Sequence, residues 1–336
     1  MLKKILFLLI LTISSLTVRA DFVTAEEAFK NHRYSEAFKQ FLPLAEKGDF
    51  RSQYYVGYLY LYGLGVTKNE SKALEYIQSS AEQEYDTAQA LLGFLYDEGR
   101  VLPLDKKKAI SYYKQAADRG NTSALLNLGL AYYKGEGVAK NNQMAIEMLK
   151  KVPLDQQPLA GRYLGEIYLT DSSLPNHYQE ALRVYSSSAK NGDVGSFYAL
   201  GQIYSSKDSG MADMQRALNF YNYAASEGYV PAQYLLGTMY VNGEGVERNL
   251  FLGHAWLELA ASNRYDPAIS ALAQVDSDMT LSETENSKKE FMRLQQEVLG
   301  RVESPFVVEE RLRAEEQEKK ASDAGRGGRR RPNHRR

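Results

Sequence analysis

The sequence predicts an all-α fold, a solenoid built from helix pairs, and two observations support that prediction. A Gly-x-x-Tyr pattern recurs six times, and every step between copies is 36 residues. A fixed period between about 20 and 50 residues is typical of solenoid proteins. Small and apolar side chains also recur at helical spacing on both sides of each glycine. The glycines are Gly57, Gly93, Gly129, Gly165, Gly201 and Gly237, and the tyrosines are Tyr60, Tyr96, Tyr132, Tyr168, Tyr204 and Tyr240.

The N-terminus has the features of a secretory signal peptide, assigned to residues 1–20. Lys3 and Lys4 precede an apolar run from Ile5 to Ile13, and residues 18–20 read Val-Arg-Ala, which favours cleavage after the alanine. A transmembrane anchor is the alternative, but the run is well short of the roughly 20 residues that span a bilayer. The short apolar core behind two lysines is typical of bacterial signals, so we expect export to the periplasm, with no transmembrane span after cleavage.

Composition adds two constraints. The chain has 336 residues and no cysteine. Oxidising compartments permit disulfides, so an exported chain without them must be stabilised by the packing of its repeats. The net charge of −1 is unevenly distributed, because residues 324–336 carry six arginines and no acidic residue. An acidic body with a basic tail is the result.

Elements are expected in the following order. Residues 21–49 form an N-terminal capping helix pair, and six repeats follow, each with a helix A, a turn and a helix B. The repeats are 50–85, 86–121, 122–157, 158–193, 194–229 and 230–265. Residues 266–308 form C-terminal capping helices, with Thr280 or Ser282 as an N-cap. Residues 309–336 form a charged, basic tail, with a short helix to about Ala321 and disorder beyond it.

Both predicted helices keep positions suited to close packing. Glycine inside a helix costs about 1 kcal/mol relative to alanine. A helix A that keeps it in six repeats is expected to use it for the close approach of a neighbouring helix. Helix B has a small residue 16 positions after that glycine and a large side chain three positions further on. The recurrent tyrosines are expected in the core of the repeats.

Turns between helices A and B contain Gly-x-Gly in three repeats, as in Gly63-Leu64-Gly65. Such a pair of glycines also occurs in phosphate-binding loops. No strand precedes these turns, however, and the third glycine of a nucleotide-binding loop is missing. A tight helix-to-helix turn is the expected structure.

The repeat pattern resembles a known family. Helix A reads Ala-x-x-x-Leu-Gly-x-x-Tyr and is followed by Gly-x-Gly-Val, and residues 108–120 read Lys-Ala-Ile-Ser-Tyr-Tyr-Lys-Gln-Ala-Ala-Asp-Arg-Gly. This pattern is similar to the Sel-one-like repeats, relatives of tetratricopeptide repeats, over residues 22–268. The resemblance implies a right-handed superhelix of antiparallel helix pairs that acts as an adaptor. Some exported members are disulfide-bridged and bind penicillins, and this chain has none of their cysteines.

No catalytic constellation is present in the sequence. Its four histidines, His32, His177, His254 and His334, lack the spacing of metal ligands. A thiol nucleophile is impossible without cysteine, and no serine lies in a Gly-x-Ser-x-Gly elbow. We therefore expect no enzyme activity, no metal and no cofactor. Penicillin binding or hydrolysis of cell-wall substrates is the alternative.

Binding is expected on the side of helix A that faces away from the repeat core. With 100° per residue, that side holds the positions three residues before the glycine and one residue after it, and we expect it to line the concave groove. An aromatic and apolar stripe of this kind suits a peptide or a partner helix. The alternative is that these side chains only pack against neighbouring turns. The residues concerned are Tyr54, Tyr58, Phe94, Leu126, Leu130, Arg162, Glu166, Tyr198, Gln202 and Tyr234.

The basic tail resembles an Arg-Gly nucleic-acid segment, and such segments bind phosphates by releasing counterions. Nucleic acid is not the expected partner of an exported protein. A solvated tail that binds nothing is the favoured interpretation, and an anionic lipid or envelope polymer is the partner expected if the tail binds one. The tail arginines are Arg326, Arg329, Arg330, Arg331, Arg335 and Arg336.

Overall fold

The computed structural model describes residues 21–300 and 302–327, and every regular element within these residues is helical. The prediction of an all-α solenoid of helix pairs is confirmed. The predicted signal peptide, residues 1–20, lies outside the described residues. Within the part of the chain that is described, no helix combines the length and the apolar character needed to cross a bilayer.

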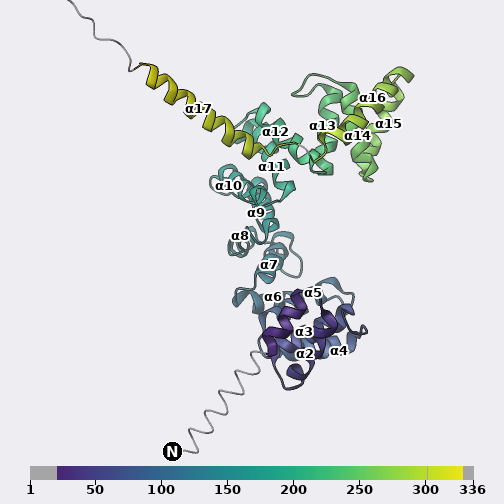
Figure 1. The fold of residues 1–336 in the computed structure, drawn as a ribbon, viewed down its shortest axis with the longest axis vertical. Coiled ribbons are helices and arrows are strands. Elements are labelled where there is room, and N and C mark those ends of the chain that lie inside the picture. Colours follow the sequence, from purple (N-terminus) through teal and green to yellow (C-terminus); the bar gives the residue numbers. More distant parts are fainter. Residues whose placement is uncertain (1–20, 301, 328–336) are drawn as a thin grey trace, which may run out of the picture. The chain divides into compact units, whose positions relative to one another are not determined.

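The chain divides into two compact units, one ending at Pro153 and the other beginning at Leu154. Unit 1 begins with a helix over residues 21–30. Its further helices are α2 (Tyr34–Glu46), α3 (Phe50–Tyr62), α4 (Glu70–Glu82), α5 (Asp86–Glu98), α6 (Lys106–Asp118), α7 (Thr122–Lys134) and α8 (Asn142–Lys150). Each helix packs on its neighbours in the chain (Figure 1). Repeats one to three are therefore α3/α4, α5/α6 and α7/α8.

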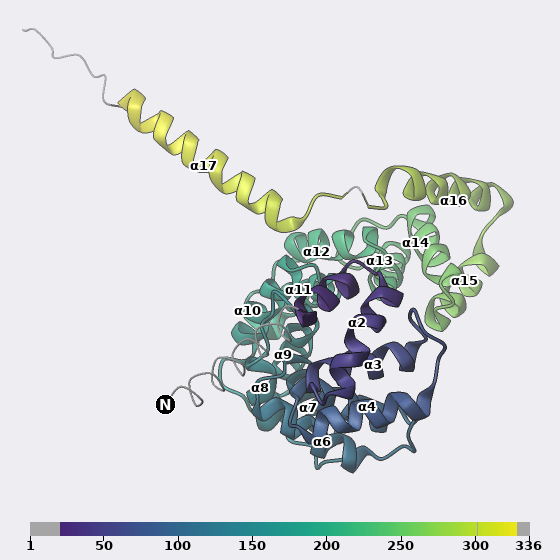
Figure 2. The same ribbon diagram turned by 60° about the horizontal axis from the view of Figure 1, so that its bottom comes forward.

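Unit 2 continues the same alternation. Repeats four to six are built from α9 (Pro158–Thr170), α10 (His177–Lys190), α11 (Val194–Ser205), α12 (Met214–Ser226), α13 (Val230–Asn242) and α14 (Leu250–Ser262), with a short 3₁₀ helix, η1 (Lys207–Ser209), in the turn of repeat five. After repeat six the chain continues with α15 (Asp266–Asp278), α16 (Leu281–Arg293), a π-helical turn η2 (Leu294–Val298) and α17 (Pro305–Gly327). The first turns of α17 lie beside α12 (Figure 2).

Polar N-caps explain where helix B begins. In five of the six repeats an Asp or Asn side chain accepts a hydrogen bond from the backbone N–H three residues later. The loss of such a cap costs about 1 kcal/mol. Repeat four differs, because Asn176 before α10 has a left-handed backbone and makes no cap hydrogen bond. The five caps are Asn69, Asp105, Asn141, Asp213 and Asn249.

The helix A glycines have a packing role in every repeat. A Cβ added to any of them would lie closer than 3.0 Å to the side chain found 20 residues later on helix B. These side chains are large, so the glycine provides the space that they occupy, which outweighs its cost in helix propensity. The side chains that pack over the glycines are Ile77, Tyr113, Leu149, Tyr185, Tyr221 and Leu257.

Glycine is also required in the tight turns. Gly63 ends α3 with a φ of 66° and donates its N–H to the carbonyl of Leu59. Gly65 has the same φ, and a Cβ there would overlap the backbone of Ser35 at the start of α2. Positive φ and close contact with a preceding helix both exclude larger residues.

The recurrent tyrosines are less uniformly buried than the sequence predicts. Three of them, Tyr60, Tyr168 and Tyr204, are buried. The other three, Tyr96, Tyr132 and Tyr240, are half-buried. A phenol ring at the edge of a helix pair can bury its apolar face and leave its hydroxyl in water, so a shared sequence position does not require equal burial.

The C-terminal region differs from the prediction in one respect. Thr280 caps α16 as expected and forms a capping box with Glu283. The helix expected to end near Ala321 continues, as α17, to Gly327. Its Glu, Lys, Arg and Ala residues favour helix, and ion pairs one turn apart, such as Arg313–Glu309, support it. Residues 328–336 lie outside the described part.

Candidate interaction surfaces

The ten predicted groove residues divide evenly between the two units. Unit 1 holds Tyr54, Tyr58, Phe94, Leu126 and Leu130, and unit 2 holds Arg162, Glu166, Tyr198, Gln202 and Tyr234. On helix A they occupy two positions, three residues before the glycine and one residue after it. The structure gives these two positions different roles.

Side chains three residues before the glycine join one repeat to the next. In four repeats this side chain contacts the residue 31 positions later. That residue is the N-cap of the next helix after the repeat. Three contacts are between tyrosine rings, with centroids 5.4 to 5.7 Å apart. The fourth is an ion pair with 3.6 Å between Arg162 Nε and Asp193 Oδ1. The ring pairs are Tyr54–Tyr85, Tyr198–Tyr229 and Tyr234–Tyr265.

In these four repeats the side chain three residues before the glycine therefore contributes to packing of one repeat on the next. Side chains one residue after the glycine are more accessible. Phe94 is 40% exposed and Gln202 is also exposed, whereas Leu126 at the other position is only 9% exposed. The remaining side chains at this position are half-buried, and they are Tyr58, Leu130, Glu166 and Thr238.

An aromatic patch surrounds Tyr58 in unit 1. The ring centroid of Tyr58 lies 4.6 Å from that of Tyr62 and 5.8 Å from that of Phe29. Tyr54 is a third neighbour at 6.0 Å. Tyr62 is 48% exposed, so the patch reaches the surface. Neither Phe29 nor Tyr62 is among the residues predicted for binding. Tyr62 follows Tyr58 by four residues, however, and this spacing places both on one helix face.

The environment of the aromatic patch keeps its phenols neutral. Burial raises the pKa of Tyr54 and of Tyr58 above the usual value, and neighbouring phenols raise each pKa further. A neutral phenol presents an O–H donor together with an apolar ring. The patch can therefore bury an apolar side chain of a partner and donate hydrogen bonds at its edge.

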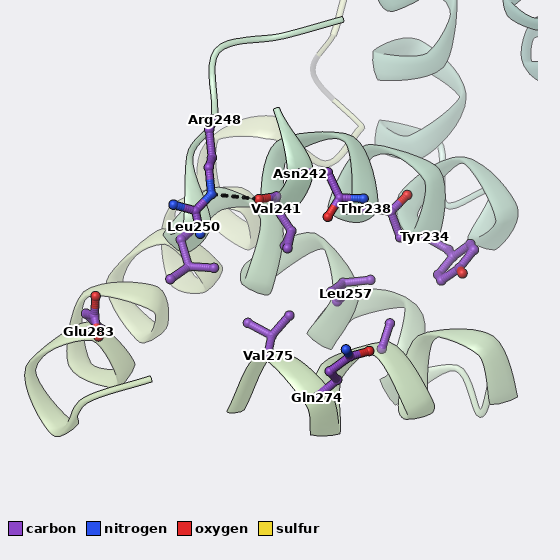
Figure 3. A pocket seen from close by; sticks show the side chains of 11 residues that line it. Tyr234, Thr238, Val241, Asn242, Arg248, Leu250, Leu257, Gln274, Val275 and Glu283 are labelled. Atoms are coloured by element: carbon purple, nitrogen blue, oxygen red, sulfur yellow. Dashed lines mark hydrogen bonds between the residues drawn. The ribbon is translucent and has the colours of Figure 1, made fainter. Parts of the chain in front are cut away.

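In unit 2 the same two helix A positions open into a pocket of about 720 Å³ beside repeat six. Tyr234 and Thr238 line one side, and Leu257 from α14 and Val275 from α15 point toward the same space (Figure 3). Arg248 stands at the rim, where its Nε donates to the carbonyl of Val241 over 2.9 Å. The lining mixes apolar and polar groups, and it includes Asn242, Gln274 and Glu283.

The tail arginines cannot be placed in a site. Arg326 belongs to α17, but its side chain is not described, and Arg329, Arg330, Arg331, Arg335 and Arg336 lie outside the described residues. Among the described residues, no group of three or more His, Cys, Asp or Glu side chains is placed to hold a metal ion.

One histidine has a structural contact that the sequence does not reveal. His254 Nε2 lies 2.8 Å from Asp276 Oδ1 and so connects α14 to α15. Both side chains lie in neighbouring helices of unit 2, and His254 itself is buried. This contact links repeat six to the C-terminal capping helices.

Comparison with known families gives one clear match. The Sel1 repeat model matches residues 51–85, 86–121, 122–151, 196–229 and 230–265, which together make up just over half of the chain. The stretch between the third and fourth matches, residues 152–195, contains α9 and α10, and the turn between these helices lacks Gly-x-Gly. No curated protein sequence matches the chain.

Two crystal structures are similar in fold. A protective antigen present in uropathogenic Escherichia coli strains, which displays an SLR fold, is 25% identical with a TM-score of 0.70 over 79% of this chain. The match spans only 57% of that antigen's length. A Sel1 repeat protein from Oxalobacter formigenes is 28% identical with a TM-score of 0.64, covering 71% of this chain and 96% of its own.

Proposed function

This chain belongs to the Sel1 repeat family, and from that premise we propose that it is a non-enzymatic scaffold that binds a protein or peptide partner through the helix A faces of its repeats. The aromatic patch around Tyr58 carries the proposal, together with the exposed ring of Phe94 one repeat later. Large aromatic side chains supply most of the binding energy at protein interfaces. An exposed ring that the repeat does not need for its own packing is available for that purpose.

The partner that suits this surface is a peptide or helix with apolar anchors. The rings of unit 1 offer apolar area, and their neutral phenols offer hydrogen-bond donors. The pocket beside repeat six offers a more polar contact, with Asn242 and Gln274 in its lining.

The proposal includes export to the periplasm. Lys3, Lys4 and the apolar run from Ile5 to Ile13 support a cleaved signal peptide. Mass measurement of the mature protein from a bacterial host tests this, and we expect an N-terminus at residue 21. A protein that keeps residues 1–20 and stays with the cytosolic fraction would contradict the proposal.

The arginines of residues 324–336 are proposed to contact an anionic envelope polymer or lipid surface. Attraction between clustered arginines and anionic head groups is electrostatic and weakens with salt. Sedimentation with anionic vesicles should therefore show a salt-sensitive component that is lost when 324–336 are deleted. Neutral vesicles serve as the control. Equal sedimentation of the deleted and full chains would remove the tail from the proposal.

Partner capture from an envelope extract tests the helix A surface. We expect the double variant Tyr58→Ala plus Phe94→Ala to recover much less partner than the wild type, since both rings lie one residue after a repeat glycine. Tyr76→Ala plus Tyr112→Ala is a matched control, because these half-buried tyrosines lie on helix B of the same two repeats. Unchanged recovery in the first variant, or equal loss in both, would reject the assignment of this face.

A labelled penicillin distinguishes the scaffold from the alternative of penicillin binding or hydrolysis. We expect neither covalent nor tight labelling of the mature chain. Labelling that unlabelled penicillin competes away would contradict the proposal and favour the alternative. Heat-denatured protein controls for nonspecific uptake of the label.

A further inference from the structure

Repeat five carries a second contact surface, on the side of its helix pair where α17 begins. The ring centroid of Phe306 lies 5.5 Å from that of Phe197 and 5.6 Å from that of Phe220. Lys190 Nζ stands 5.1 Å from the centroid of the Phe306 ring. An aromatic side chain of α17 is therefore held between two rings and a cation.

An ion pair one turn along α17 completes this contact. Arg216 Nε and Nη2 donate to the two carboxylate oxygens of Glu309 over 2.6 and 2.7 Å. The Arg216 guanidinium also lies 4.5 Å from the centroid of Tyr204. Tyr204 in turn stacks on Phe220, with ring planes 4° apart. A bidentate guanidinium that is fixed on a ring recognises a carboxylate with defined geometry.

The surface that receives α17 is not a general feature of the repeats. Repeats one, two and six have glutamine where repeat five has Phe197, and each of these amides donates to the carbonyl of the residue eight positions earlier. Tyr223, whose ring lies 4.3 Å from Phe197, is replaced by Ser79 in repeat one and Gln115 in repeat two. Lys190 lies at the end of α10 in repeat four, and the equivalent residues before repeats one and two are acids, Glu46 and Glu82. Only at repeat five does the sequence combine the aromatic floor and Arg216 with a lysine from the end of the preceding repeat.

Packing around the contact is incomplete, as expected for an exchangeable ligand. A pocket of about 380 Å³ lies on one flank, between Asn222 of α12 and Pro305 and Val308 of α17. Another of about 340 Å³ lies beside Arg216 and Leu312. Leu312 is 56% exposed, so apolar side chains of α17 do not all pack against the repeat. Phe306 and Glu309 provide the specific contacts.

We propose that this surface of repeat five is a binding site for a helix that presents an aromatic residue and, three residues later, a carboxylate. The chain's own α17 occupies the site as an internal ligand, and a partner helix of the same pattern displaces it. The site is distinct from the helix A faces, and the proposal does not depend on them. Displacement releases α17 together with the basic residues that follow it.

Binding of a synthetic peptide to the full mature chain tests this proposal. The probe is a fluorescent peptide of residues 303–316, and the opened chain is the double variant Phe306→Ala plus Glu309→Ala. We expect the peptide to bind the opened chain at least about tenfold more tightly than the wild type, in which α17 competes. Adding Arg216→Ala to the opened chain should abolish the gain. Adding Lys108→Ala, a cation stacked on Tyr96 in repeat two, should leave it unchanged.

A charge exchange tests the same contact without the opened chain. We expect the Arg216→Glu variant to bind a peptide that carries Glu309→Arg and to reject the unmodified peptide. Equal binding of the unmodified peptide to wild type and opened chain would overturn occupancy by α17. Failure of both the opened chain and the charge exchange to bind their peptides would overturn the site itself.

Discussion

Repeats two and five share one backbone plan but present different side chains to solvent. In both, the helix A glycine accommodates a tyrosine from helix B, Tyr113 in repeat two and Tyr221 in repeat five. One residue after that glycine, repeat two presents the exposed Phe94 and repeat five presents Gln202. Recognition can therefore change from repeat to repeat while the packing positions stay fixed.

The difference also shows which positions hold the solenoid together. Side chains three residues before the glycine contact the next N-cap through inclined aromatic rings in some repeats and through an ion pair in repeat four. Side chains one residue after the glycine have no such shared contact. If this division is correct, substitutions at the two positions must have separable effects on stability and on binding.

The largest expected effect comes from the glycine itself. Gly93→Leu forces a side chain into space already filled by Tyr113, and overpacking of this kind costs about 3 kcal/mol. Phe94→Leu at the neighbouring position should change the free energy of unfolding by about 0.5 kcal/mol or less. Urea denaturation of the two variants measures both values. A stable Gly93→Leu variant would show that the glycine is not fixed by packing.

A smaller loss is expected at the joint between repeats. Tyr198→Ala removes the ring that packs against Tyr229, and truncation of a half-buried aromatic side chain should cost about 2 kcal/mol. Gln202→Ala on the same helix should cost little, because its side chain is exposed. Thermal denaturation distinguishes the two. Similar midpoints for both variants would contradict the assignment of inter-repeat packing to the position three residues before the glycine alone.

Alkaline pH provides a third comparison of buried and accessible tyrosines. Burial raises the pKa of Tyr55 to about 12, with Glu26 nearby as a further cause, and burial raises that of Tyr221 to about 12. Because the pKa in the folded state lies above the unfolded value of 10.0, the neutral form of each tyrosine stabilises the folded protein. This contribution is fully present below pH 10 and is lost as pH rises toward 12. Phenolate absorbance should therefore show a late-titrating fraction that Tyr55→Phe reduces. Ionisation of every tyrosine near pH 10 would contradict this.

The smallest effect is expected for the ion pair of repeat four. A double-mutant cycle with Arg162→Ala and Asp193→Asn should give a coupling of about 0.5 kcal/mol, and added salt should reduce it. Asp193 also caps α11 by accepting a hydrogen bond from the Ser196 N–H. Asparagine keeps an oxygen that accepts this bond, so the substitution removes the charge and retains the cap. A coupling energy as large as that of a tyrosine pair would mean that the ion pair and the ring pairs contribute equally to packing between repeats.

Much of the fold follows from the sequence, because its period places equivalent residues at equivalent positions. Gly57 and its counterparts, the Gly-x-Gly turns and the Thr280 cap are all local features, and local chemistry is visible in a single stretch of chain. The two groove positions could not be separated in this way. The partner of Tyr54 is Tyr85, the N-cap of α5, and only the packing of one repeat on the next brings these rings together.

The role of α17 was hidden for a similar reason. Its Glu, Lys and Arg content indicates a solvated helix, and the helix continues to Gly327, beyond the predicted end. Phe306 contacts Phe197, and Glu309 pairs with Arg216; each partner lies about 100 residues earlier in the sequence. No periodicity links such distant residues, so the contact emerges only from the structure.

Site-specific cross-linking in cells tests the central claim most directly. A photoreactive amino acid in place of Phe94 should give a discrete cross-linked partner, because this side chain is exposed. The same amino acid in place of Leu126, which is buried, should give none. We expect cross-linking at position 94 alone. Equal cross-linking at both positions, or none at position 94 with the partner present, would contradict it.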